Sequence, residues 1–216
     1  MNYTVDIHSA LEWKSAQPRK KEEKRIGVST DVKPSNEKPG LSPEFAGVMR
    51  ETLLYWASRE LETTKKVLSA IPDAKADYRP DPHARTAWEL AWHLASMDIH
   101  FLNGIADFKL DMDVPDEESK PKTVAELVDW YDQNFKRATD RIRALTPEQL
   151  VTPINFLGAF QLPAVAYLAF FNNHRVHHRG QLSSYLRPMG SKCPSIYGAS
   201  FDEPWQGAAV ITTSHS

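Results

Sequence analysis

Apolar residues recur at steps of three and four positions along four stretches of this chain, which is the spacing of amphipathic α-helices. These stretches cover residues 42–72, 86–107, 123–145 and 163–188. No stretch shows the alternation of apolar and polar residues that convincingly indicates a β-strand. The pattern therefore predicts an all-α fold, a four-helix bundle in which each helix turns its apolar stripe towards the others.

Residues at the ends of the stretches support these boundaries. Ser42 followed by Pro43 suits a helix start, because serine caps the first turn and proline lacks an N–H that would need a partner there. Two capping boxes, each a threonine followed three residues later by a glutamate, mark further starts at Thr86 with Glu89 and Thr123 with Glu126. The last helix is expected to begin at Pro163. The tryptophans at helical positions are expected in or near the core: Trp56, Trp88, Trp92 and Trp130.

The segments between and beyond the helices complete the predicted organisation. Residues 1–41 are polar, carry mixed charges and contain several prolines, which is typical of a mobile arm. Residues 146–161 contain three large apolar residues and are expected to pack over one end of the bundle. The apolar segment 194–198 is expected to fold back onto the helices. We therefore predict an arm before a bundle domain over residues 42–200, and a C-terminal tail over residues 201–216.

A histidine pair carries the strongest chemical signal. His174 and His178 are four residues apart, so on a helix they lie on one face and can bind one metal ion. Apolar residues continue their line at helical spacing: Tyr167, Phe171, Leu182 and Tyr185. The two imidazoles are therefore predicted to point into the protein. Two desolvated polar rings side by side are unusual unless a proton or a metal ion lies between them.

His93 is the best candidate for a third ligand. It lies two turns inside the second helix, on a stripe that it shares with Leu90, Met97 and Phe101. A buried histidine is on its own more often a hydrogen-bonded core residue, so the pair in the last helix is what favours a ligand role here. Three histidines from two helices give three nitrogen ligands and at least one open position, which is typical of a catalytic site. A divalent ion, zinc or nickel, suits such ligands.

The other histidines are weaker candidates. His177 competes with His178, but helical geometry turns it about 60° to the other side of His174, so it is interpreted as a rim or interface residue. His100 lies two turns beyond His93, about 10 Å along the helix, where it would border the pocket. Three more histidines are expected at the surface: His8, His83 and His215. Glu89 precedes His93 by one turn and is placed to hydrogen-bond a ligand imidazole, although its capping role explains it equally well.

Composition limits which partners and which cellular compartment are expected for the protein. The formal net charge is −2 and charged residues make up 25% of the chain, so nucleic acid is not an expected partner. No apolar run is long enough to span a membrane, and the N-terminus lacks the pattern of a signal peptide. Cys193 is the only cysteine and forms no disulfide within one chain. We therefore predict a cytoplasmic protein that does not bind membranes.

Several segments together resemble a known family. They are the long first helix, the Trp-His-Leu segment around His93, the run H-x-x-x-H-R-G-Q-L from His174 to Leu182, and the segments 186–190 and 194–198. Over residues 42–200 the chain is similar to the DinB-like (DinB/YfiT) superfamily. The resemblance implies a four-helix bundle of up-down-down-up connection that holds a divalent metal through three histidines. These match His93, His174 and His178 in this sequence. The family pattern does not account for the N-terminal extension.

The resemblance also implies two hypotheses for function. Characterised relatives include thiol-dependent S-transferases and a mycothiol-dependent isomerase, and the fold is often dimeric. The first hypothesis is a metal-dependent transferase, isomerase or hydrolase that acts on a small-molecule substrate. Its nucleophile would be a metal-bound water or a low-molecular-weight thiol. The second hypothesis is a non-catalytic metal-binding or stress-response protein, which a closed fourth coordination position would favour. A weaker alternative is an interaction module whose helix faces form a homodimer.

Overall fold

The computed structural model describes residues 40–111 and 120–204. Within these residues, the long helices are α2 (Pro43–Ser69), α3 (Ala87–Ala106), α4 (Val124–Arg143) and α6 (Ala166–Leu186). The shorter elements are η2 (Asp73–Lys75), α5 (Pro147–Leu150), β1 (Pro153–Phe156) and β2 (Phe160–Pro163). The predicted all-α four-helix bundle is confirmed. Almost all of the predicted arm, and the tail from residue 205, lie outside the described residues.

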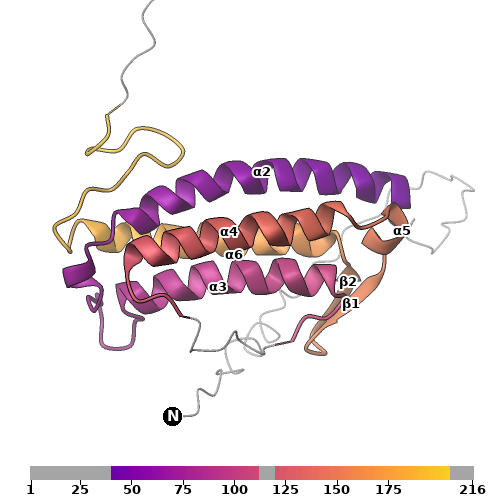
Figure 1. Ribbon diagram of the computed structural model, residues 1–216, viewed down its shortest axis with the longest axis horizontal. Helices are drawn as coiled ribbons and strands as arrows, with labels where there is room; N and C mark the ends of the chain where they lie inside the picture. The colour runs from indigo at the N-terminus through magenta and orange to yellow at the C-terminus, as the bar shows by residue number, and fades with distance from the viewer. Residues whose placement is uncertain (1–39, 112–119, 205–216) are drawn as a thin grey trace, which may run out of the picture. The chain divides into compact units, whose positions relative to one another are not determined.

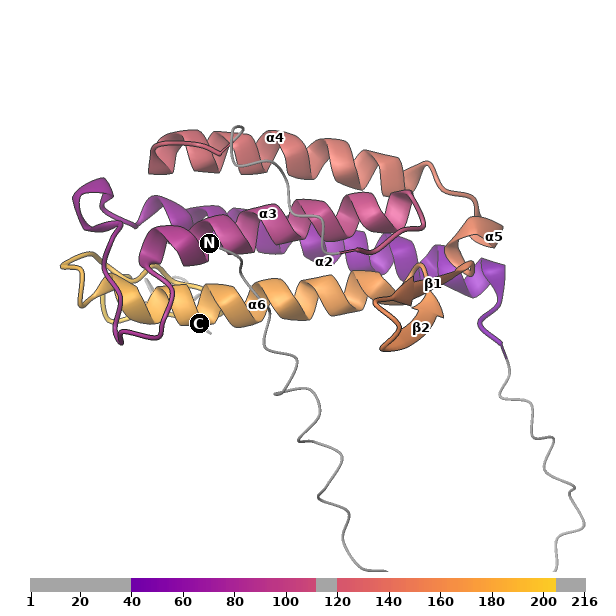
Figure 2. The same ribbon diagram turned by 90° about the horizontal axis from the view of Figure 1, so that it is seen from below.

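The four long helices follow the up-down-down-up connection that the resemblance implied. Figures 1 and 2 show α2 and α6 running in one direction and α3 and α4 in the other. Near the C-terminal ends of α4 and α3, Arg141 Nη1 donates to Asn103 Oδ1 at 2.8 Å, as parallel helices require. Arg50, near the start of α2, donates to the carbonyl of Leu145 just beyond α4 at 2.6 Å, as antiparallel helices require. The parallel pair places the starts of α3 and α4 at the same end of the bundle.

The helix starts follow the predicted chemistry in three of four cases. Ser42 Oγ accepts from the Phe45 N–H at 3.3 Å, and both predicted capping boxes are complete at Thr86 and Thr123. The fourth prediction is wrong, because α6 begins at Ala166 with no side-chain cap. Pro163 instead ends strand β2, where the chain is still extended.

A small β-hairpin corrects the prediction that the chain contains no strand. Strands β1 and β2 pair antiparallel, with Phe156 opposite Phe160. Between them, Leu157 and Gly158 have positive φ angles of 52° and 71°, and the Ala159 N–H donates to the Phe156 carbonyl at 2.9 Å. Two successive positive φ values give the tight turn of a hairpin. Leucine rarely adopts this conformation, so its presence in the sequence does not indicate such a turn. As expected, this segment packs over one end of the bundle, with the ring of Phe156 6.1 Å from that of Phe101.

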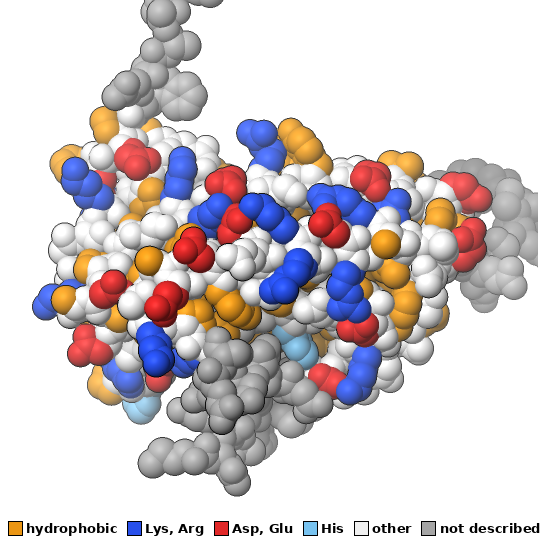
Figure 3. Space-filling view, viewed as in Figure 1, with side chains coloured by type: hydrophobic (Ala, Val, Ile, Leu, Met, Phe, Trp, Pro, Cys, Tyr) orange, Lys and Arg blue, Asp and Glu red, His pale blue; other side chains and the backbone are white. Residues whose placement is uncertain are grey.

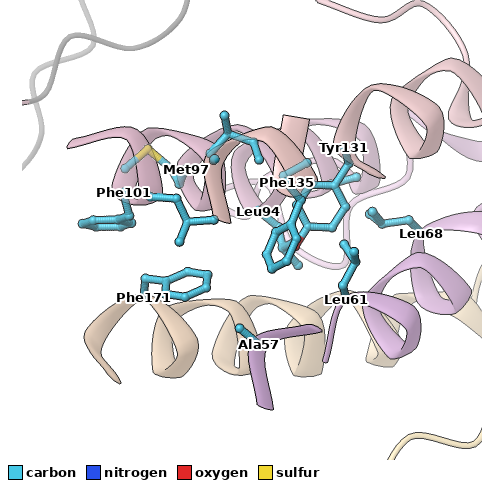
Figure 4. Close-up of a cluster of buried hydrophobic side chains, with 14 of the residues drawn as sticks. Ala57, Leu61, Leu68, Leu94, Met97, Phe101, Tyr131, Phe135 and Phe171 are labelled. Atoms are coloured by element: carbon cyan, nitrogen blue, oxygen red, sulfur yellow. The ribbon is translucent and has the colours of Figure 1, made fainter. Parts of the chain in front are cut away.

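The core fills the space between the helices with aliphatic and aromatic side chains. Figure 4 shows Leu61 and Leu68 of α2 facing Tyr131 and Phe135 of α4, with Phe171 of α6 closing the cluster. Burying such side chains stabilises each by about 1.5–3 kcal/mol relative to exposure.

The expectation for the tryptophans holds only in part. Trp92 is buried against Trp130, with ring centroids 5.0 Å apart, and Trp88 packs against the core. Trp56, however, is 54% exposed. Its neighbour Ala57 takes the buried position of α2 instead, and one residue is a turn of about 100° around a helix.

The segment after α6 returns to the bundle, as its apolar residues suggested. Ser191 Oγ donates to the Ala70 carbonyl at 2.6 Å, and Arg187 pairs with Asp202 at 2.9 Å. On the face that α2 and α4 form, basic and acidic side chains are interspersed (Figure 3). None of the helices in the described residues combines the length and apolar character needed to cross a membrane.

Candidate metal centre

Three histidines meet between α3 and α6. One ring nitrogen from each of His93, His174 and His178 lies within 4.8 Å of the others. The Nε2 atoms of His93 and His178 are 3.2 Å apart. The ring centroids are 4.4 Å apart for His174 and His178, and 5.3 Å apart for His93 and His174. The structure therefore brings together the three residues that the sequence singled out.

Regular helical backbone holds all three rings. His93 is two turns inside α3, and His174 and His178 are one turn apart in α6, which runs antiparallel to α3. The residues that share their stripes are buried: Leu90, Met97, Phe101, Tyr167, Phe171 and Leu182. The rings themselves are half-buried rather than fully enclosed. One side of the cluster is therefore accessible from the surface, which the sequence pattern did not predict.

Burial keeps the three imidazoles neutral at physiological pH. Loss of solvent lowers the pKa of His93 to about 3, with the positive charge of Arg85 as the next largest cause. Loss of solvent also lowers the pKa of His174 to about 4, assisted by His178, and it lowers the pKa of His178. Neutral imidazole is the form that binds metal ions, so no proton has to be displaced at pH 7.

The hydrogen bonds around the rings orient His178 and leave one buried nitrogen of His174 without a partner among the described residues. Gln181 Oε1 lies 2.7 Å from His178 Nδ1, so Nδ1 carries the proton and Nε2 presents its lone pair towards His93. His174 Nδ1 is buried and has no hydrogen-bond partner among the described residues. A buried nitrogen without a partner costs about 1–3 kcal/mol. A divalent cation would satisfy these nitrogens together, so the residues fit a metal ion.

The remaining candidates lie outside this cluster. His177 is exposed, with its ring 4.9 Å from that of His178, and it does not belong to the group of three. His100 Nε2 lies 2.6 Å from the Asp111 carbonyl. Glu89 accepts from the Thr86 N–H at 2.7 Å, so its capping role is the one observed. His83 is exposed in a loop as expected, while His8 and His215 lie outside the described residues.

Sequence reasoning missed a buried ion pair next to the histidines. Asp98 of α3 and Arg175 of α6 are both fully buried, and Asp98 Oδ2 lies 3.4 Å from Arg175 Nε. Tyr131 of α4 donates to the same carboxylate at 2.5 Å, and Arg175 donates to the Ala57 carbonyl of α2 at 3.1 Å. This polar cluster links all four helices. Burial raises the pKa of Asp98 to about 6, although the charge of Arg175 opposes the shift. A signal existed in the sequence, because Asp98 lies in an otherwise apolar stretch.

Arg179 forms a second buried contact one turn along α6. It is 1% exposed and pairs with Glu60 of α2, while its Nη2 donates to the Tyr197 hydroxyl at 2.5 Å. Each buried arginine directly follows a histidine of the cluster. Helix α6 therefore presents His174 and His178 to α3, and it turns Arg175 and Arg179 about 100° further round into the core.

Loss of the Gln181 hydrogen bond is expected to weaken metal binding. In Gln181→Ala, His178 Nδ1 loses the acceptor that fixes its tautomer and ring orientation. We expect the dissociation constant for zinc to rise about tenfold, the lower end of the range for such supporting groups, because Gln181 is exposed. Competition with a chromogenic chelator measures this. Asn173→Ala, which removes another exposed amide from α6, is the control and should bind zinc like the native protein.

The metal-free protein is expected to lose stability in mild acid. The folded-state pKa values of His93 and His174, about 3 and about 4, lie below the usual histidine value of 6.5, so the unfolded chain binds more protons in between. The stabilisation is complete above about pH 6.5 and falls as the pH drops. Asp98 acts in the opposite direction below about pH 6, but it is one group against two. Urea denaturation at about pH 7.5 and about pH 5 tests the sign, and greater stability at the lower pH contradicts it.

The fold and the cluster define a helical bundle with a three-histidine candidate metal site. Residues 57–182 match the sequence profile of the DinB superfamily, and the chain belongs to this family. It is 29% identical over 146 residues to the uncharacterised protein YrdA of Bacillus subtilis strain 168, covering 67% of this chain and 85% of that protein.

Two solved structures show the same fold. A DinB-like protein from Bacillus cereus ATCC 10987 aligns with a TM-score of 0.59 and 24% identity, covering 68% of this chain and 97% of that one. A DinB-like protein from Bacillus subtilis, YjoA, aligns with a TM-score of 0.51 and 22% identity, covering 63% and 91%. The expected family membership is thus confirmed.

Proposed function

We propose that the protein binds a divalent metal ion, zinc or nickel, through His93, His174 and His178, and that it is a metal-dependent enzyme acting on a small molecule. The observation that carries the proposal is the convergence of three neutral imidazoles, one of which, His174, has a buried Nδ1 without a hydrogen-bond partner among the described residues. The histidines also lie at the positions where the family resemblance places its metal ligands. Rings that are only half-buried leave one side of the centre open to a second ligand.

Different residues of the chain would bind the metal ion, orient its ligands and exclude water at such a centre. A divalent cation supplies Lewis acidity, which lowers the pKa of a thiol or a water molecule bound beside it. His93, His174 and His178 hold the cation, and Gln181 keeps the His178 ring in the required tautomer. Phe101 packs against His174, with ring centroids 5.5 Å apart, and excludes water from the inner side. This arrangement supports thiol transfer, thiol-assisted isomerisation or hydrolysis, with a low-molecular-weight thiol as the partner in the first two.

A non-catalytic metal-binding protein is the alternative, and it requires a fourth ligand that closes the centre. In the described residues, the group of three includes no carboxylate. Metal analysis of protein purified without a histidine tag, followed by a panel of thiols and electrophiles, separates the two functions. Turnover that disappears in both His93→Ala and His178→Ala supports the enzyme. Full metal content without turnover on any pair supports the alternative.

Chelation is expected to lower the melting temperature of the protein. A metal that binds only the folded state adds about 2.7 kcal/mol when its free concentration is about 100 times the dissociation constant. Differential scanning calorimetry before and after verified removal of the metal measures the effect, and re-addition of zinc should restore it. An unchanged melting curve after removal would count against a centre coupled to the fold.

A further inference from the structure

A cavity between α2 and the segment after α6 is lined by aromatic side chains that are not part of the core. Its volume is about 610 Å³, which lies within the usual range for small-molecule binding sites. Tyr55 and Trp56 of α2 line this cavity, together with Ile196 and Tyr197 of the segment that follows α6. Tyr55 is 58% exposed, Trp56 54% and Tyr197 71%. Exposed aromatic rings that gather around one cavity indicate a binding surface.

Hydrogen bonds and ring contacts hold these aromatic side chains in place. The Tyr197 hydroxyl donates to Glu60 Oε2 at 3.0 Å and accepts from Arg179 Nη2 at 2.5 Å. The guanidinium of Arg179, which is 1% exposed, also lies over the Tyr197 ring, 5.0 Å from its centre. The rings of Tyr55 and Trp56 meet edge to face, with centroids 5.4 Å apart. A ligand therefore meets walls that are already ordered, which lowers the entropic cost of binding.

One positive charge in the lining of the cavity has no counter-ion among the described residues. Arg59 lines the cavity, its Cζ lies 5.9 Å from the centre of the Tyr55 ring, and its guanidinium makes no hydrogen bond or ion pair within residues 40–111 and 120–204. The two glutamates of the lining are already paired. Glu60 is the partner of Arg179, and Glu62 lies 3.2 Å from a lysine one turn further along α2. The charge that remains for a ligand is therefore positive.

These groups together define the chemistry of a ligand. Aromatic faces pack against planar apolar rings, and a guanidinium binds a carboxylate or similar anion through two parallel N–H groups. A cationic ligand would be repelled by Arg59, and a neutral one would leave its guanidinium without a partner. The complementary ligand is therefore both aromatic and anionic.

We propose that this cavity binds a small planar aromatic anion, whose ring system contacts Trp56 and Tyr197 and whose anionic group pairs with Arg59. The lining of the cavity includes none of the three clustered histidines, so the site is separate from the candidate metal centre. The inference goes beyond the proposed function and does not depend on a bound metal ion.

Three probes with one ring system test the proposal: 2-naphthoate, its neutral amide 2-naphthamide, and the cation 2-naphthylmethylammonium. Calorimetric titration of the full chain measures each dissociation constant. We expect 2-naphthoate to bind about fivefold more tightly than the amide, as a charge-assisted contact at an exposed site allows, and the cation to bind most weakly. Tightest binding of the cation overturns the assignment to anions, and failure of the native protein to bind 2-naphthoate overturns the site.

Arg59→Gln tests the source of the preference for an anion. In this variant 2-naphthoate and 2-naphthamide should bind equally. Arg137→Gln removes another exposed arginine, from α4 and outside the lining, and should keep the native preference. His178→Ala should also keep it, whereas its loss there would show that the carboxylate binds at the metal centre and would overturn the separate site. An equal preference in the native protein and Arg59→Gln overturns the role of Arg59.

Trp56→Ala tests the aromatic contact. It should weaken the binding of 2-naphthoate and 2-naphthamide alike by about five- to tenfold, because a contacting ring is lost. Phe45→Ala removes another exposed aromatic residue of α2 that lies outside the lining, so it is the matched control and should bind both probes like the native protein. Unchanged binding in Trp56→Ala overturns the site. Sedimentation equilibrium that shows self-association of the native protein, lost in Trp56→Ala, would show that a second copy covers the cavity and would also overturn it.

Discussion

Asp98→Ala is expected to lower the free energy of unfolding by about 3–5 kcal/mol, because it leaves Arg175 charged in the core without its counter-ion. Both side chains are fully buried, and Arg175 has the Phe135 and Phe171 rings around it instead of water. Tyr131 loses its acceptor in the same variant. Guanidinium chloride denaturation at about pH 7.5, above the pKa of about 6 of Asp98, measures the loss.

Two further variants show whether burial is the cause. Asp107→Ala removes an exposed ion pair with Arg141 between α3 and α4, and it should cost less than about 1 kcal/mol. The double variant Asp98→Leu with Arg175→Met replaces the buried charges by apolar groups of similar size and should recover most of the stability. Equal losses in Asp98→Ala and Asp107→Ala would show that the buried pair has no special weight.

The helices and the histidine cluster could be predicted because they depend on residues that are close together in the sequence. Capping boxes at Thr86 and Thr123 act within one turn, and the spacing of His174 and His178 fixes their common face once a helix is assumed. The apolar neighbours of His93 then indicate which face of α3 turns inward. These inferences need no knowledge of which helix lies beside which, apart from the meeting of α3 and α6.

The features that the sequence did not reveal depend on tertiary contacts. Leu157 adopts a positive φ in the hairpin turn, a conformation that its residue type does not indicate, and the hairpin packs on the end of the bundle. Arg175 and Arg179 are charged residues that a composition argument assigns to the surface, yet partners on α2 and α3 allow them to be buried. Trp56 is exposed, and its neighbour Ala57 takes the buried position of α2.

The orientation of α6 positions both its histidines and its buried arginines. The rotation that places Arg175 against Asp98 is the same rotation that presents His174 to His93, since the residues are neighbours on one rigid helix. Asp98 and His93 are likewise on one helix, α3. The buried ion pair and the histidine cluster therefore fix the same relative position of α3 and α6, one from inside the core and the other near the surface.

His93→Ala and His178→Ala are each expected to raise the dissociation constant for zinc by more than about 100-fold, the upper end of the range for loss of an outer supporting group. Each variant leaves two nitrogens where three converge within 4.8 Å. The rings are half-buried, so the helices should persist, and circular dichroism of the metal-free variants checks this. Calorimetric titration with zinc, in competition with a chelator, measures the affinity.

His177→Ala is the control, because it removes a neighbouring histidine that is not a predicted metal ligand. His177 is next to His178 in sequence and its ring is 4.9 Å away, but it is exposed and outside the group of three. Its removal should change the zinc affinity by less than about threefold, because it contributes neither a ligand nor a hydrogen bond to one. A loss in His177→Ala as large as that in His178→Ala would mean that α6 presents a different face to the metal. The pairing of His178 with Gln181 argues against that, since it aims Nε2 of His178 at His93.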